Sequence, residues 1–182
     1  RDRLTGLGKW SAEDIARYLK TGSFKDKTTV FGPMAEVVHN STGQMTDADL
    51  LAMGTYLKTI PSNSSLSENR KKVDATHLAG AKLYIDNCSG CHQSSGRGIT
   101  NVIPPLAGNP VVMAEKPNNI IKVMLEGIKQ RDGYIAMPSY AANLNNEEIL
   151  EISNYVRSSW GNGADPNVTK SLVESIRKNP TP

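Results

Sequence analysis

The sequence has 182 residues, a formal net charge of +3 at pH 7, 38% hydrophobic residues and 5% aromatic residues. This length allows one or two domains, and so small a net charge, with no stripe of Lys and Arg, argues against nucleic acid as a partner. No run of about 18 apolar residues occurs, so no transmembrane segment is predicted. The pattern indicates only helices and loops, which predicts an all-α fold.

The N-terminal part of the chain predicts two amphipathic helices. Residues 14–22 and 49–58 each carry aliphatic side chains at helical spacing. Between them lies Phe31-Gly-Pro-Met34. Residues 61–73 follow, rich in Ser and Asn and ending in Arg and Lys, and this composition predicts an interdomain linker.

Both cysteines of the chain lie in Cys88-Ser-Gly-Cys91-His92. Gly80 and Tyr84 precede Cys88 at four-residue intervals, so the three residues share one helical face. The motif spacing places two thiols where they can form thioethers with haem vinyl groups, and the adjacent imidazole becomes an axial iron ligand. We therefore predict one covalent haem c, with iron bound by His92.

Three other chemistries use paired cysteines. A thioredoxin-like redox pair needs a βαβ setting, and no strand pattern precedes Cys88. A zinc knuckle needs further ligands, and only His39 and His77 remain. A disulfide at this tight spacing would be strained. The motif favours haem over all three.

A methionine that follows the motif predicts the second axial ligand. Met137 lies in a loop before the last helix, Pro138 keeps it extended, and a loop can aim a thioether across the haem face. Met113 is a rival ligand. Met124, on the apolar face of a helix predicted over residues 117–125, reads as a core residue.

Several other side chains are candidates for roles around the haem. Arg97, Arg131 and Tyr134 are candidate partners of the haem propionates, since buried carboxylates need donors. His39 is an alternative ligand that fits a solvent-facing position better, and His77 reads as exposed.

The last predicted helix begins at Asn145, which together with Glu148 forms a pattern like a capping box. An apolar stripe along this helix predicts that one face is buried. The complete domain is therefore predicted over residues 74–164, with residues 165–182 as a C-terminal tail.

The chain also contains an internal repeat. Residues 49–58 align without gaps on residues 148–157, and residues 14–22 align on residues 119–127. Met34 lies between the first pair of aligned helices, in the place that Met137 has between the second pair. Residues 1–60 are therefore predicted to be the C-terminal half of a second haem domain, with Met34 as axial ligand only to a haem that is not encoded in this chain.

A half-domain leaves apolar helix faces without cover. The side chains concerned are Ile15, Leu19, Leu50, Met53 and Leu57. We expect the downstream domain or a second copy of the chain to cover them, which predicts self-association through residues 1–60.

The motifs together resemble class I cytochrome c. The resemblance covers residues 80–92, Pro104-x-Leu106, the Met137 loop and Ile152-x-x-Tyr155. It implies crossed N- and C-terminal helices, and a backbone carbonyl of Pro104 that orients His92. Pro105 is an alternative source of that carbonyl.

Most of the chain is also similar to the triple-haem cytochrome subunits of membrane-associated bacterial dehydrogenases for alcohol, aldehyde, gluconate and sorbitol. The similarity rests on residues 4–22, 31–38, 106–112 and 159–162. It implies a periplasmic protein, associated with the outer face of the cytoplasmic membrane, that takes electrons from a dehydrogenase catalytic subunit and delivers them to ubiquinone or a terminal oxidase. Such a subunit has no catalytic site of its own. The alternative is a haem enzyme, a peroxidase or a sulfur-compound dehydrogenase, with a labile sixth ligand.

Overall fold

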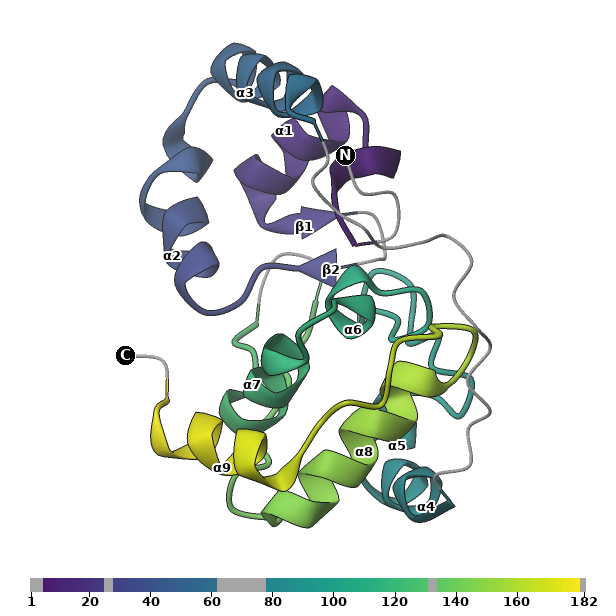
Figure 1. Ribbon diagram of the computed structural model, residues 1–182. Helices are drawn as coiled ribbons and strands as arrows, with labels where there is room; N and C mark the ends of the chain where they lie inside the picture. Colours follow the sequence, from purple (N-terminus) through teal and green to yellow (C-terminus); the bar gives the residue numbers. More distant parts are fainter. Residues whose placement is uncertain (1–4, 25–27, 62–77, 131–133, 181–182) are drawn as a thin grey trace.

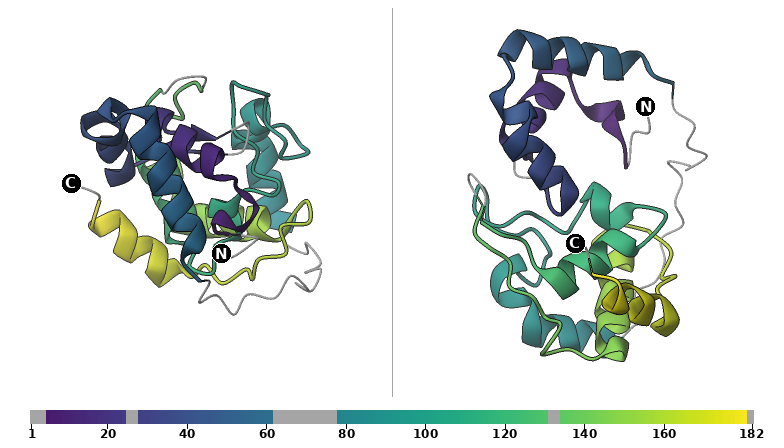
Figure 2. Two further views of the ribbon diagram at one scale, coloured as in Figure 1. Left: turned by 90° about the horizontal axis from the view of Figure 1, so that it is seen from above. Right: turned by 90° about the vertical axis from the view of Figure 1, so that its left-hand side faces the viewer.

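The chain forms two helical units in a computed structural model that describes residues 5–24, 28–61, 78–130 and 134–180 (Figure 1). The N-terminal unit lies above the C-terminal unit in Figure 1, and the side view of Figure 2 also separates them. Helices dominate both units, which confirms the all-α fold. None of the helices in these ranges is long and apolar enough to cross a bilayer.

Two crossing helices form the centre of the N-terminal unit. Its elements are η1 (Leu7–Lys9), α1 (Ala12–Thr21), β1 (Ser23–Phe24), β2 (Thr28–Thr29), α2 (Pro33–Asn40), η2 (Thr42–Gln44) and α3 (Asp47–Thr59). Helices α1 and α3 bury Ile15, Leu19 and Leu50 between them. A side-chain carbon at Gly54 would collide with the carbonyl oxygen of Ala12, so this glycine permits the close crossing. The three buried side chains therefore need no cover from outside the unit, contrary to the expectation above.

A short β-hairpin interrupts the helical pattern, and the sequence did not indicate it. Strands β1 and β2 pair antiparallel with Ser23 opposite Thr29. Gly22 reverses the chain after α1 with a φ of 76°, and its carbonyl accepts a hydrogen bond from the amide of Val30 at 2.8 Å. The β-branched residues that follow favour an extended backbone, which explains the strand.

In the C-terminal unit, the first and last helices of the predicted domain cross closely, as expected. The elements are α4 (Leu78–Asn87), α5 (Ser89–His92), α6 (Pro110–Met113), α7 (Asn118–Glu126), α8 (Asn146–Ser158) and α9 (Lys170–Lys178). At Gly80 in α4, a side-chain carbon would collide with the carbonyl oxygen of Glu151 and lie 2.8 Å from Cβ of Tyr155 in α8. Tyr84, one turn later, is fully buried and packs its ring against Tyr155 and Trp160.

Helix α9 lies within residues 165–182, which were predicted as a tail. Asn145 does open α8 with a capping box, as expected. Helix α9 then buries Val173 and Ile176 against the main core and contacts α7 and α8. The signal was present in the sequence, because Thr169 is a good N-cap residue and the apolar residues after it have helical spacing.

Each of the two aligned helix pairs has an equivalent tether, a hydrogen bond from a cation near the end of the second helix to a backbone carbonyl before the first helix. Lys58 near the end of α3 donates a hydrogen bond to the carbonyl of Leu7, just before α1, at 3.1 Å. Arg157 near the end of α8 donates to the carbonyl of Val112, before α7, at 2.9 Å. The Arg157 side chain is buried, and its guanidinium reaches three further backbone carbonyls. The internal repeat therefore extends from sequence to local geometry.

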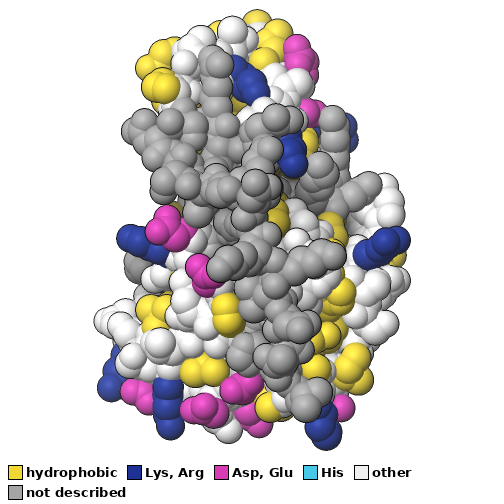
Figure 3. All heavy atoms as spheres, turned by 45° about the vertical axis from the view of Figure 1, so that its right-hand side comes forward, with side chains coloured by type: hydrophobic (Ala, Val, Ile, Leu, Met, Phe, Trp, Pro, Cys, Tyr) yellow, Lys and Arg dark blue, Asp and Glu magenta, His cyan; other side chains and the backbone are white. Residues whose placement is uncertain are grey.

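Helix α3 lacks the cover that α8 has. Tyr56 aligns with Tyr155, yet 67% of its surface is exposed, and the neighbouring Leu51 and Met53 are exposed as well. In the described part of the chain, nothing lies on α3 as α4 lies on α8. Figure 3 shows hydrophobic side chains at the top of the molecule, where Figure 1 places α3.

We expect Gly80→Ala to lower the free energy of unfolding by about 1–3 kcal/mol, because the added methyl group overpacks the crossing of α4 and α8. Gly90→Ala is the matched control, since no heavy atom would lie within 4 Å of its new Cβ. Denaturant unfolding of both variants measures the difference. Equal midpoints for Gly80→Ala and the parent chain would show that the crossing is not tight.

Candidate functional site

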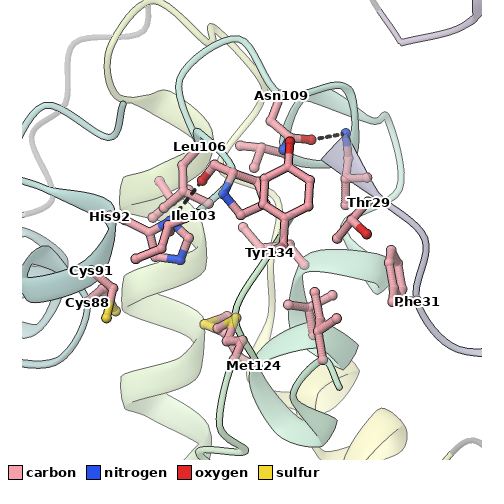
Figure 4. Close-up of a pocket in the computed structure, with 18 of the residues that line it drawn as sticks. Thr29, Phe31, Cys88, Cys91, His92, Ile103, Leu106, Asn109, Met124 and Tyr134 are labelled. Carbon is pink, nitrogen blue, oxygen red and sulfur yellow. Dashed lines mark hydrogen bonds between the residues drawn. The ribbon is translucent and has the colours of Figure 1, made fainter. Parts of the chain in front are cut away.

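The cysteine–histidine motif forms a tight turn at the end of α4. The carbonyl of Cys88 accepts hydrogen bonds from the amides of Cys91 at 3.2 Å and His92 at 2.9 Å. The amide of Cys88 donates to the carbonyl of Tyr84 at 2.8 Å, which ties α5 to α4. Figure 4 shows the sulfur atoms of Cys88 and Cys91 together at one end of a cleft, with His92 beside them.

The imidazole of His92 is oriented by a backbone carbonyl. Its Nδ1 lies 3.1 Å from the carbonyl oxygen of Pro104. A carbonyl only accepts, so this contact assigns the proton to Nδ1 and leaves the lone pair on Nε2. Burial lowers the pKa of His92, and the hydrogen bond to Pro104 opposes this shift. A neutral imidazole with a fixed tautomer is the form that binds a metal.

The loop after the motif holds that carbonyl in place. The amide of Gly98 donates to the carbonyl of His92 at 3.0 Å, and Gly98 adopts a left-handed backbone with a φ of 64°. A side-chain carbon at Gly98 would collide with the carbonyl oxygen of Ile103. Only glycine therefore lets the chain pass close enough to present Pro104 to the imidazole.

The motif lies at one end of a deep apolar cleft. The space between its walls, together with the open solvent at its mouth, is about 1190 Å³. Side chains of α7 and α8, including Met124, Ile152 and Val156, line one part of it. In Figure 4, Tyr134 and Phe31 lie away from the two cysteines, toward the other end.

Met137 lines the same cleft and is held there by its backbone. Its amide donates to the carbonyl of Ile128 at 2.8 Å, and its carbonyl accepts from the amide of Ile128 at 2.9 Å. Gly127, with a φ of 74°, allows this close approach, because a side-chain carbon there would lie 2.5 Å from the carbonyl oxygen of Met137. The Met137 side chain is partly buried against the main core.

Other methionines occupy different places. Met124 lines the cleft from α7 and is buried in the main core, which fits its predicted packing role. Met113, the rival ligand, is buried but is not among the cleft-lining residues. Met34 packs inside the N-terminal unit and does not line this cleft either. Met34 also differs from Met137 in its setting. Met137 pairs with Ile128 just after α7, whereas the residue that pairs with Ser23 just after α1 is Thr29. Met34 lies further along the chain, in α2.

The two thiols differ in environment. Burial raises the pKa of Cys88 to about 11, with a further contribution from Cys91, so Cys88 is a neutral thiol. Cys91 is exposed.

Within the described ranges, no group of three or more His, Cys, Asp or Glu side chains could hold a metal ion.

Three aromatic side chains anchor the motif through hydrogen bonds that sequence reasoning missed. The Tyr84 hydroxyl donates to the carbonyl of Gln93 at 2.6 Å, and the Tyr140 hydroxyl donates to the carbonyl of Asn87 at 3.0 Å. The indole of Trp160 donates to the carbonyl of Ser94 at 3.0 Å. The sequence placed Tyr84 on the helical face that leads to Cys88, but no local pattern identifies a distant carbonyl as the acceptor.

The remaining sequence candidates are dispersed. Tyr134 is buried and lines the cleft, whereas Arg97 is exposed and does not. Arg131 and His77 lie outside the described residues. His39 is exposed on α2, away from the cleft lining, in agreement with a solvent-facing position.

Comparison with known proteins shows which family this arrangement belongs to. The sequence profile described as cytochrome c matches residues 78–160. Cytochrome c-552 of Thermus thermophilus is 36% identical over 90 residues, which cover 45% of this chain and 68% of that protein. The chain belongs to the cytochrome c family.

Longer relatives match almost the whole chain. The cytochrome c subunit of the quinone alcohol dehydrogenase of Komagataeibacter europaeus is 35% identical over 100% of this chain and 42% of its own length. The gluconate 2-dehydrogenase cytochrome c subunit of Pantoea cypripedii is 31% identical over 99% of this chain and 44% of its own length. The chain therefore spans less than half the length of these relatives.

Members of this family carry covalent haem c, and the residues present fit that group. The two thiols lie together at the end of the cleft, as thioether formation requires, and a neutral imidazole lies beside them with its Nδ1 already engaged. The apolar lining suits a porphyrin face. Pro104, rather than Pro105, supplies the carbonyl in contact with His92.

In haem-loaded protein, we expect Met137→Ala to remove the thioether-to-iron charge-transfer band and to let cyanide or carbon monoxide bind, because Met137 is the thioether held in the cleft by its own backbone. Visible absorption and ligand titration measure both effects. Met113→Ala is the control and should leave the band intact, since Met113 lies outside the cleft lining. The reverse outcome would identify Met113 as the ligand.

Proposed function

We propose that the C-terminal domain, residues 74–164, binds one haem c through Cys88 and Cys91, with His92 and Met137 as axial ligands, and that the chain carries single electrons. The observation that most supports this is a convergence of groups in one apolar cleft. The adjacent cysteines, the oriented imidazole and the Met137 loop come from three separate segments and line the same space.

The chemistry of these groups favours electron transfer. When bound, the haem supplies one-electron chemistry at its iron. His92 presents a neutral imidazole, and Met137 presents a thioether that favours ferrous iron. If His92 and Met137 both bind the iron, they leave no position on it for a substrate. Electron transfer is therefore favoured over the alternative of a peroxidase or sulfur-compound dehydrogenase, and the chain needs no catalytic site of its own.

The long relatives suggest the setting of this electron transfer. They are named as cytochrome c subunits of alcohol, gluconate and fructose dehydrogenases. By analogy, the chain receives electrons from a dehydrogenase catalytic subunit and passes them to ubiquinone or a terminal oxidase. This role places it in the periplasm, associated with the outer face of the cytoplasmic membrane.

The N-terminal unit fits the role of an incomplete haem domain within residues 1–60. Its α1 and α3 repeat the tether of α7 and α8, yet the face of α3 that bears Tyr56 is open. In a longer polypeptide, the missing half of that domain would cover this face and bring the haem that Met34 ligates. In this chain alone, the same face supports self-association.

The intact protein, matured in a host that attaches haem c, should have the mass of the polypeptide plus one haem. Cys88→Ala and Cys91→Ala should each weaken or abolish the covalent attachment, and His92→Ala should abolish the low-spin spectrum, because each removes a bond that holds the group. Mass spectrometry and visible absorption measure these effects. Met34→Ala is the control and should change neither. A mass equal to the bare polypeptide would contradict the proposed function.

We expect residues 1–182 to self-associate at high protein concentration, because burying the open face of α3 removes apolar surface from water. Tyr56→Lys should weaken this association by placing a charge in the interface. Ile85→Lys is the control, since Ile85 is 50% exposed but lies on α4. Light scattering measures the molar mass. A strictly monomeric parent chain would refute the interface.

A further inference from the structure

The wall of the haem cleft is not made by the C-terminal unit alone. Thr28, Thr29 and Phe31 of the N-terminal unit also line it. Figure 4 shows Thr29 and Phe31 at the end of the cleft opposite Cys88 and Cys91. The N-terminal unit therefore reaches the site from the side that is farthest from the thioether bonds.

The chemistry of haem c defines what lies at that end. Thioethers form on the vinyl-bearing edge of the porphyrin, and the two propionates project from the opposite edge. A haem anchored at Cys88 and Cys91 would therefore direct its propionates toward the end of the cleft where Thr29 and Phe31 lie. The polar side chains of Asn109 and Tyr134 lie toward this end too, and both residues are buried.

We infer that the segment from Thr28 to Phe31 closes the propionate edge of the haem cleft, so that the N-terminal unit belongs to the haem site of the C-terminal unit. This inference rests on the proposed binding of haem c by Cys88 and Cys91. It assigns a function in this chain to a unit that holds no haem-attachment motif of its own.

The segment is anchored as a wall requires. The Thr29 hydroxyl donates a hydrogen bond to the carbonyl of Gly22 at 3.1 Å, and the amide of Val30 donates to the same oxygen at 2.8 Å. Val30 is buried in the N-terminal unit. The ring of Phe31 is therefore presented by a fixed strand end, and Met34, three residues later, packs inside the same unit.

A charge placed at position 31 tests whether that position lies beside the haem. Ferric haem carries one more positive charge than ferrous haem, so a nearby cation disfavours the ferric form and raises the reduction potential. Phe31→Lys should raise the potential of the holoprotein, and Phe31→Glu should lower it. Surface charges farther away than the Debye length, about 8 Å at physiological ionic strength, act much more weakly.

Thr55→Lys and Thr55→Glu are the matched controls. Thr55 is exposed on α3, which Figure 1 places at the far end of the N-terminal unit from the cleft. Redox titration of the haem absorption should give opposite shifts for the two Phe31 variants and the parental potential for both Thr55 variants. Phe31→Leu should retain the parental potential, because it keeps an uncharged apolar wall.

Equal potentials in the Phe31 and Thr55 pairs would overturn the inference, while covalent haem and a low-spin spectrum in the same samples would still uphold the proposed function. Absence of covalent haem from the matured parent chain would overturn the proposed function and this inference with it. Opposite shifts at position 31 alone support the closure of the haem edge by the N-terminal unit.

Discussion

The close crossing of α4 and α8 positions the helix that ends at the cysteine–histidine motif against a helix that lines the cleft. Gly80 has no side chain, and this lets the backbone of α4 approach Glu151 and Tyr155 of α8. Helix α4 ends at the motif and thereby carries Cys88, while α8 contributes apolar side chains to the cleft. Any side chain at position 80 would separate the two helices, and the thiols would move relative to the wall they face. A packing constraint far from the iron-binding atoms thus determines the geometry of the site.

The cleft combines an apolar interior with a polar exterior scaffold. The Tyr84, Tyr140 and Trp160 side chains donate their hydrogen bonds to backbone carbonyls around the motif. Each ring thereby satisfies its polar atom with a hydrogen bond while its apolar body packs against the core. The same logic applies to His92, whose Nδ1 is paired with Pro104 so that only Nε2 is available for a metal. The acceptor for His92 is a backbone carbonyl, which carries no charge, so the imidazole is oriented without a charged side chain in the cleft.

The internal repeat shows how one architecture is used at two levels of completeness. Arg157 and Lys58 make equivalent tethers, but the guanidinium is buried and satisfied by several carbonyls, whereas the Lys58 ammonium reaches two. The N-terminal unit buries its helix pair by itself and leaves the outer face of α3 open. The repeat is inexact at the hairpin. Thr29 is paired at the position that corresponds to Met137 in the second unit, and Met34 lies further along the chain, within α2. An alignment of helices alone did not reveal this inserted element.

The sequence by itself determined the chemistry of attachment and the main helices. Cys88, Cys91 and His92 are nearly contiguous, so any turn brings them together, and helical periodicity and capping residues act within a few positions of the chain. Only the tertiary structure decided that Pro104 contacts His92, that Met137 lines the cleft and Met113 does not, and that Phe31 joins the wall from another unit. It also revealed α9, which is stabilised by burial against α7 and α8. These features depend on contacts between residues far apart along the chain. Their free energy comes from burial and hydrogen bonding that exist only once the helices have packed. Local patterns, such as the N-cap residue and apolar spacing of α9, therefore do not establish these contacts.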